Sequence, residues 1–88
     1  MLYTGWVVLF TGSAFRHGYG EEDFYEVLDS QPLKTRSRRG LKGVYEVYGR
    51  NHAGDYLHIA LREEPGRTTV FHMRRMSDRE KRFYRSRR

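Results

Sequence analysis

The chain has 88 residues with a formal net charge of +6, and it contains no cysteine. A chain of this length forms one small domain, and without cysteine it can build neither a disulfide framework nor a thiolate zinc site. The apolar stretch near its start, residues 6–10, is too short to span a bilayer and lacks the basic residues of a secretory signal, so we expect a soluble, unprocessed cytoplasmic protein with no membrane partner.

The first half of the chain predicts a strand, a helix and a basic loop. Residues 2–10 are rich in β-branched and aromatic side chains and are followed by a Thr-Gly pair, as in a short strand. Residues 21–30 predict a helix, because their first turn is acidic, their apolar side chains have helical spacing and Pro32 follows. Residues 33–43 hold five basic residues and two glycines, which favours a loop that becomes ordered on binding.

Three strands and a closing helix are predicted from the second half. Residues 43–50, 55–62 and 67–75 are separated by turn sequences, and together they predict a three-stranded meander. Ser77 and Glu80 have the spacing of a capping box, which begins a terminal helix. The element order β-α-β-β-β-α indicates an α+β fold built on a small antiparallel sheet of about four strands.

The charge is unevenly distributed along this single predicted domain, residues 1–88. Residues 1–31 carry a net charge of −4, residues 32–61 of +4 and residues 62–88 of +6. The last four residues, 85–88, form a basic tail that we expect to be frayed. Clustered positive charge is typical of a protein that binds a polyanion, most often a nucleic acid. The alternative is a solvated surface that keeps the protein soluble.

Strand alternation divides the meander into two faces. One face carries apolar side chains and is the predicted core, formed by Leu57, Ile59, Leu61, Phe71 and Met73. The opposite parity of the last strand carries Thr68, Val70, His72 and Arg74. With Val47 placed in the core, the second face becomes an exposed polar surface made of Glu46, Tyr48, Arg50, His58, His72 and Arg74.

This polar surface contains the groups that RNA cleavage without a metal requires. A base removes the proton of a 2′-hydroxyl, an acid protonates the leaving 5′-oxygen, and fixed cations stabilise the negative charge that develops on the phosphate. Glu46 or a histidine can act as the base, and His58 or His72 as the acid. Arg50 and Arg74 are the candidate cations.

RNA binding is predicted to extend beyond these catalytic candidates. Tyr48 and Tyr56 offer rings on which an unstacked base can lie. The further predicted RNA contacts are Arg75, Lys42, Arg39 and His17. The four histidines of the chain occupy four different segments and form no close ligand pair, so neither a metal nor a cofactor is expected.

Residues 15–28, 50–57 and 70–84 form three segments that, taken in order, are similar to parts of toxins of the BrnT type. Residues 15–28, with Arg-His-Gly before an acidic helix, resemble the family's Lys-His-Gly segment and its acidic helix. Residues 50–57 resemble its Gly-Arg, small turn and Leu stretch. Residues 70–84, in which an arginine pair precedes Ser-x-x-Glu and an aromatic pair, resemble its closing strand and helix.

The resemblance implies a RelE-like fold and a type II toxin–antitoxin system, in which the toxin is a metal-independent endoribonuclease that inhibits translation. It also implies a cognate antitoxin that neutralises the toxin and, in a hetero-oligomer with it, binds promoter DNA. The ribosome is a further candidate partner. The residues that match the family pattern are His17, Arg50, Arg74 and Glu80. Of these, the resemblance makes Arg74 the leading candidate for a catalytic residue.

Two alternatives belong to other functional classes. A non-catalytic RNA- or DNA-binding module, or a degenerate relative of the toxins, uses the same charge through phosphate contacts alone. A protein-interaction domain uses the basic terminal helix to dock an acidic partner. Glu46, His58, His72 and Arg74 distinguish the nuclease from these alternatives, because a binding module needs positive charge but no acid–base pair.

Overall fold

The fold is α+β, as predicted, with five strands in place of about four. The computed structural model describes residues 7–87. Its elements, in chain order, are β1 (Val7–Phe10), the 3-10 helix η1 (Gly12–Phe15), α1 (Glu21–Asp29), β2 (Leu33–Arg36), β3 (Val44–Arg50), β4 (Tyr56–Glu64), β5 (Arg67–Arg75) and α2 (Asp78–Ser86). The predicted first strand is confirmed over its last four residues, and its earlier part lies outside the described residues.

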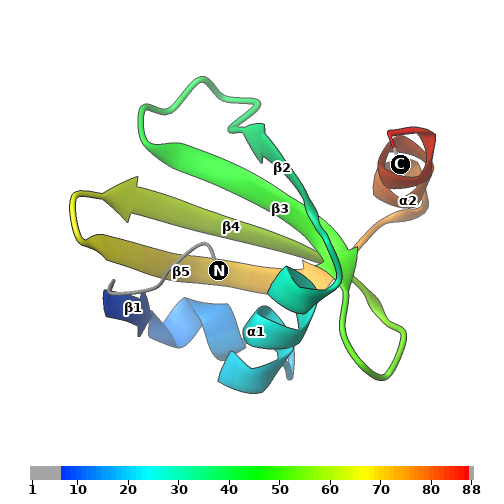
Figure 1. Cartoon of the computed structure of the whole chain (residues 1–88), viewed down its shortest axis with the longest axis horizontal. Helices are drawn as coiled ribbons and strands as arrows, with labels where there is room; N and C mark the ends of the chain where they lie inside the picture. Colours follow the sequence, from blue (N-terminus) through cyan, green and yellow to red (C-terminus); the bar gives the residue numbers. More distant parts are fainter. Residues whose placement is uncertain (1–6, 88) are drawn as a thin grey trace.

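The strands form one sheet in the order β1-β5-β4-β3-β2 (Figure 1). The predicted meander is confirmed, because β3, β4 and β5 pair antiparallel in succession. At one edge β1 pairs with β5 in the parallel direction, after which the chain crosses through η1 and α1 to β2 at the other edge. The sheet is therefore mostly, but not wholly, antiparallel.

The additional strand, β2, corrects the prediction of a loop over residues 33–43. Leu33 lies opposite Tyr48 and Thr35 lies opposite Glu46, so the start of this basic segment adds an edge strand to β3. Its lysine and arginine side chains alternate outwards to solvent, while Leu33 and Thr35 are half-buried. The basic residues concealed this alternation, which extends over only four residues.

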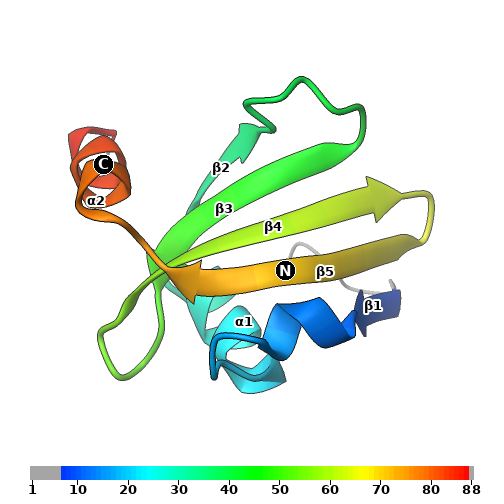
Figure 2. The same ribbon diagram turned by 180° about the vertical axis from the view of Figure 1, so that it is seen from behind.

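One face of the sheet packs against α1 and η1 and contains the main hydrophobic core (Figure 2). Leu57, Ile59, Leu61 and Met73 are fully buried there, as predicted. α1 approaches β3 closely at Gly49, where an added Cβ would lie 2.7 Å from the Ser30 hydroxyl oxygen. A larger residue at this position would push the helix off the sheet.

A β-bulge in β5 changes the predicted faces of that strand. His72 lies opposite Ala60, but the next paired residue, Val70, lies opposite Leu61, so Phe71 is an extra residue. Val70 and Thr68 are consequently fully buried in the core, although strict alternation placed them on the polar face. Phe71, predicted as core, is only half-buried. The assignments of His72 and Arg74 hold, because both follow the bulge.

The second face of the sheet is covered at one end by α2, which lies beyond the end of β5 and apart from α1 (Figure 1). Tyr84 and Met76 pack on Tyr48 in a small second core, flanked by partly buried Leu33, Tyr56 and Phe83. Ser77 caps the helix as predicted: its hydroxyl accepts a hydrogen bond from the Glu80 N–H, and the Glu80 carboxylate accepts one from the Ser77 N–H.

α2 continues into the segment expected to be a frayed tail. Arg85 and Ser86 are helical, and the N–H of Arg87 still donates to the Tyr84 carbonyl. Within residues 7–87, neither helix has the length and apolar character needed to cross a membrane.

Candidate active site

The centre of the polar face predicted as exposed is instead buried. Glu46 is 8 % exposed, His58 6 % and Tyr48 2 %. The strand register was right, since Tyr48 pairs with His58 and His58 with Arg74, but Phe83 and Tyr84 of α2 pack on Tyr48, and the Tyr48 hydroxyl bonds to Glu46. Tyr48 is therefore closed to a stacking base, and neither Glu46 nor His58 is open to a substrate as the prediction required.

Glu46 is the acceptor at the centre of this buried group. Its Oε1 accepts hydrogen bonds from the Tyr48 hydroxyl and from Nε2 of His58, both at 2.9 Å, and its Oε2 accepts the backbone N–H of Arg38 at 2.9 Å. Since a carboxylate only accepts, Nε2 of His58 carries the proton. Nδ1 of His58 has no hydrogen-bond partner among the described residues.

These contacts keep Glu46 ionised and make it a poor proton acceptor. Burial opposes ionisation, but the hydrogen bonds from Arg38, His58 and Tyr48 outweigh it and lower the pKa of Glu46 from 4.5 to about 2. Burial, together with the hydrogen bond to Glu46, raises the pKa of Tyr48. Glu46 consequently holds its neighbours in place, and its lowered pKa disfavours the general-base role that the sequence allowed.

A second carboxylate, Glu80, joins α2 to the end of β5. Arg74 binds it with two parallel hydrogen bonds of 2.7 and 2.8 Å, and the arginine also donates to the carbonyl of Arg75. Burial again opposes ionisation, but the bonds from Arg74 and the Ser77 N–H outweigh it and lower the pKa of Glu80 to about 2. The predicted exposed catalytic Arg74 is thus a partly buried structural cation, with a side chain 32 % exposed.

Arg38, between β2 and β3, connects the two carboxylates. Its Nε lies 3.5 Å from Oε1 of Glu46 and its Nη2 lies 3.5 Å from Oε2 of Glu80. The sequence showed Arg38 only as one charge in a basic segment. Because its partners are eight and 42 residues away, no local pattern could assign it this role.

The two carboxylates predict that the protein loses stability in acid. Both have folded-state pKa values below the ordinary 4.5, so their stabilisation is complete above about pH 5 and is lost as the pH falls towards 2. We expect the free energy of unfolding, measured with urea, to fall by about 2 kcal/mol per carboxylate over this range. Glu80→Gln should remove about half of this pH dependence. Glu64→Gln, which alters a carboxylate whose side chain is 40 % exposed and pairs with Arg67, should retain it, and equal behaviour of the two variants would contradict the assignment.

Three histidines form a row that runs from the buried group to the surface. The ring of His58 contacts that of His72 at 5.5 Å between centroids, and His72 contacts His17 at 5.7 Å. His58 is buried, His72 is half-buried and His17 is exposed. Burial, and then electrostatic interactions with His58, Arg74 and His17, lower the pKa of His72 and favour its neutral ring. Sequence parity placed His58 and His72 together but had no means to add His17.

An open pocket of about 330 Å³ adjoins the outer end of this row and is lined by His17, Tyr19, Arg74 and Arg75. Nε of Arg75 donates to the Tyr19 hydroxyl at 3.0 Å, and that hydroxyl donates to Asp55 at 3.1 Å. Arg75 also forms an ion pair with Asp55 at 3.5 Å, and its side chain remains 73 % exposed. Tyr19 and Asp55 therefore fix the guanidinium of Arg75 at this pocket.

The remaining predicted residues lie away from this pocket. Arg50 packs over the ring of Tyr56, with its guanidinium carbon 4.8 Å from the ring centroid. Arg39 and Lys42 are exposed on the β2–β3 hairpin. Arg50 is therefore not part of the histidine row, although it shares a sheet face with it.

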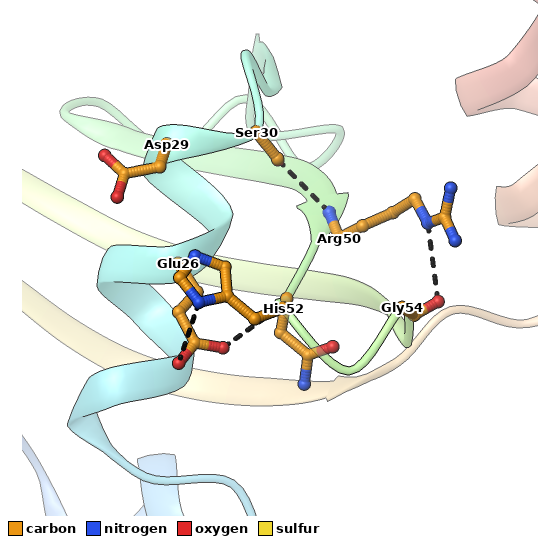
Figure 3. Close-up of a pocket in the computed structure, with 7 residues that line it drawn as sticks. Glu26, Asp29, Ser30, Arg50, His52 and Gly54 are labelled. Atoms are coloured by element: carbon orange, nitrogen blue, oxygen red, sulfur yellow. Dashed lines mark hydrogen bonds and ion pairs between the residues drawn. The ribbon is translucent and has the colours of Figure 1, made fainter.

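A larger pocket of about 390 Å³ lies between α1 and the β3–β4 loop (Figure 3). Its polar groups are mostly paired with one another: Glu26 accepts the backbone N–H of His52, and the Ser30 hydroxyl accepts that of Arg50. The Arg50 side chain extends away from α1, on the side where α2 lies (Figure 3). Glu26 and the ring of His52 also pair here, with Oε2 3.7 Å from Nδ1, but His52 is the single histidine of this lining. The pocket therefore lacks the two neighbouring imidazoles of the histidine row and is not the candidate site.

Among residues 7–87, no three His, Asp or Glu side chains are grouped so as to hold a metal ion. The chain matches no protein-family model, and none of the curated proteins matches it significantly. The functional assignment therefore depends on the geometry of the histidine row and the pocket beside it.

Proposed function

We propose that this protein is an endoribonuclease that cleaves RNA by attack of a 2′-hydroxyl, without a metal. The observation that carries the proposal is the contact between the rings of His17 and His72, 5.7 Å apart, beside a pocket lined by Arg74 and Arg75. Two imidazoles and fixed cations are sufficient for the proton transfers and charge stabilisation that this reaction needs.

His72 is the proposed base and His17 the proposed acid. The neutral ring of His72 takes the 2′-hydroxyl proton, and the 2′-oxygen attacks the neighbouring phosphorus. The bond from phosphorus to the 5′-oxygen breaks, and protonated His17 gives its proton to that leaving oxygen. The products are a 2′,3′-cyclic phosphate and a 5′-hydroxyl. Arg75, whose side chain is exposed, stabilises the charge on the phosphate oxygens.

The buried group has a positioning role in this scheme. Glu46 holds His58 by a 2.9 Å hydrogen bond, and the ring of His58 packs edge-on against His72 at an angle of 68°. The bidentate pair of Arg74 and Glu80 holds α2 against the end of β5. These contacts fix the His72 ring next to the pocket before any substrate arrives.

The resemblance to BrnT-type toxins gives this activity a biological setting. We propose that the protein is a cytoplasmic toxin of a type II toxin–antitoxin system, which inhibits translation by cleaving RNA and is neutralised by a cognate antitoxin. A non-catalytic nucleic-acid-binding module is the second candidate. It is favoured by the engagement of Glu46, His58 and Arg74 with partners inside the protein, which leaves only part of the predicted catalytic set accessible.

Induced expression in a bacterial host tests the proposed function. The wild type should arrest growth and produce new RNA ends, whereas His17→Ala should do neither while it accumulates as folded protein. His17 suits this test because it is exposed and forms no hydrogen bond with the described residues. Normal growth with intact RNA, from folded wild-type protein, would contradict the proposal and favour the binding module.

A further inference from the structure

Three cationic side chains converge on the ring of Tyr56, outside the cleavage pocket. The guanidinium carbon of Arg50 lies 4.8 Å from the ring centroid, and Nζ of Lys81 and the guanidinium carbon of Arg85 each lie 5.2 Å from it. Arg50 comes from the end of β3, and the other two are one turn apart on α2. Residues far apart in the sequence thus place three positive charges around one ring.

The ring and its neighbours hold these cations without neutralising them. Within residues 7–87, none of the three forms an ion pair with a carboxylate. Arg85 donates to the Tyr56 hydroxyl at 3.4 Å, and Arg50 donates to the Gly54 carbonyl at 3.4 Å. The hydrogen bond from Arg85, followed by the charges of Arg85, Arg50 and Lys81, lowers the pKa of Tyr56. The local potential is therefore positive, and each contact with the face of the ring is a favourable cation–π interaction.

This cluster lies beside the histidine row on the same face of the sheet. Tyr56 and His58 are two residues apart on β4, which separates them by about 7 Å along the strand. The carbonyl of Tyr56 accepts the N–H of Met76, just after the end of β5 that carries Arg74 and Arg75. The cluster therefore lies next to the end of β5 whose Arg74 and Arg75 line the pocket.

We propose that Arg50, Lys81 and Arg85 form a second binding site, which takes a backbone phosphate of single-stranded RNA next to the cleaved bond. The choice of RNA rests on the proposed function, whereas the choice of a phosphate follows from three cations that are held around one ring and have no carboxylate partner among residues 7–87. Tyr56, predicted as a platform for a base, instead supports the cations, because these and the edge of Tyr84 pack around its ring.

α2 offers a matched pair of variants for the test. Lys81→Gln/Arg85→Gln removes two cations of the cluster, while Arg79→Gln/Arg82→Gln removes two exposed cations elsewhere on the same helix with the same change in net charge. Binding is measured by fluorescence anisotropy with a labelled single-stranded oligonucleotide whose sugars are 2′-deoxyriboses. This probe retains the phosphates but lacks the 2′-hydroxyl, so the readout does not depend on cleavage.

We expect the Lys81/Arg85 variant to bind the oligonucleotide more weakly than the wild type. The slope of log affinity against log salt concentration should become less steep by about 1.4, which is about 0.7 for each lost phosphate contact. The Arg79/Arg82 variant should keep a slope near that of the wild type. Arg50→Gln, on a different element, should reduce the slope by about 0.7.

Two results would overturn the proposal. An equal loss in both double variants would mean that only overall charge matters, and no loss in either would mean that the cluster serves another ligand, such as an acidic protein. If the wild type does not cleave RNA and only the Lys81/Arg85 variant loses affinity, the proposed nuclease activity is contradicted but this phosphate site is supported. Thermal unfolding of each variant checks that α2 remains docked.

Discussion

Replacing His72 by alanine is expected to lower the rate of RNA cleavage by about 100- to 10,000-fold, the usual contribution of one positioned acid or base. The effect is large because His72 is the ring that joins the buried group to the pocket, in contact with both His58 and His17. The rate is measured with purified protein and a labelled RNA. Burial lowers the pKa of His72 below 6.5, so this base loses its proton at a lower pH than an ordinary histidine. The wild-type cleavage rate, which rises with pH as the base becomes neutral, should therefore level off at a lower pH.

His52→Ala is the matched control for this variant. His52 is exposed on the β3–β4 loop, where it contacts Glu26 and no member of the histidine row. The His52→Ala protein should cleave RNA as fast as the wild type. A His72→Ala protein that is folded and retains the full rate would remove His72 from the mechanism.

Arg74→Ala is expected to destabilise the protein by about 2–3 kcal/mol, which is large for a change on the polar face of a sheet. The substitution removes both hydrogen bonds to Glu80 and leaves a buried carboxylate with only the Ser77 N–H and the more distant Arg38 as partners. Urea unfolding at neutral pH measures the loss. Arg74→Lys should recover part of it, because lysine supplies the charge but not the bidentate geometry.

Arg75→Ala provides the comparison for this stability effect. Arg75 is the next residue but is 73 % exposed, so its removal should change the free energy of unfolding by less than about 1 kcal/mol. Equal destabilisation by the two changes would contradict the structural role given to Arg74. If that role is correct, a loss of toxicity in Arg74→Ala reports unfolding of α2 and does not by itself identify a catalytic residue.

Much of this fold follows from local patterns in the sequence. The turns between β3, β4 and β5, the acidic start of α1 and the capping box at Ser77 each predicted an element that the structure contains. β2 was missed because a four-residue edge strand with two basic residues has the composition of a loop. The bulge at Phe71 was missed because it depends on pairing with β4, which no pattern within β5 reveals.

The candidate site could be predicted only in part, for a related reason. Alternation along the strands correctly brought Glu46, His58, His72 and Arg74 to one face. It could not indicate that α2 would pack on Tyr48 at one end of this face, nor that Glu46 and His58 would be buried. Contacts between distant segments, such as those of Arg38 with Glu46 and Glu80, depend on the tertiary structure and carry no local signature.

The most direct test of the central claim is the chemistry of the RNA ends. Purified protein is incubated with single-stranded RNA in the presence of a chelator, and the products are identified by mass spectrometry. The account predicts 2′,3′-cyclic phosphate and 5′-hydroxyl ends, made by the wild type and His52→Ala but not by His72→Ala. Intact RNA, or ends with a 5′-phosphate and a 3′-hydroxyl, would contradict it.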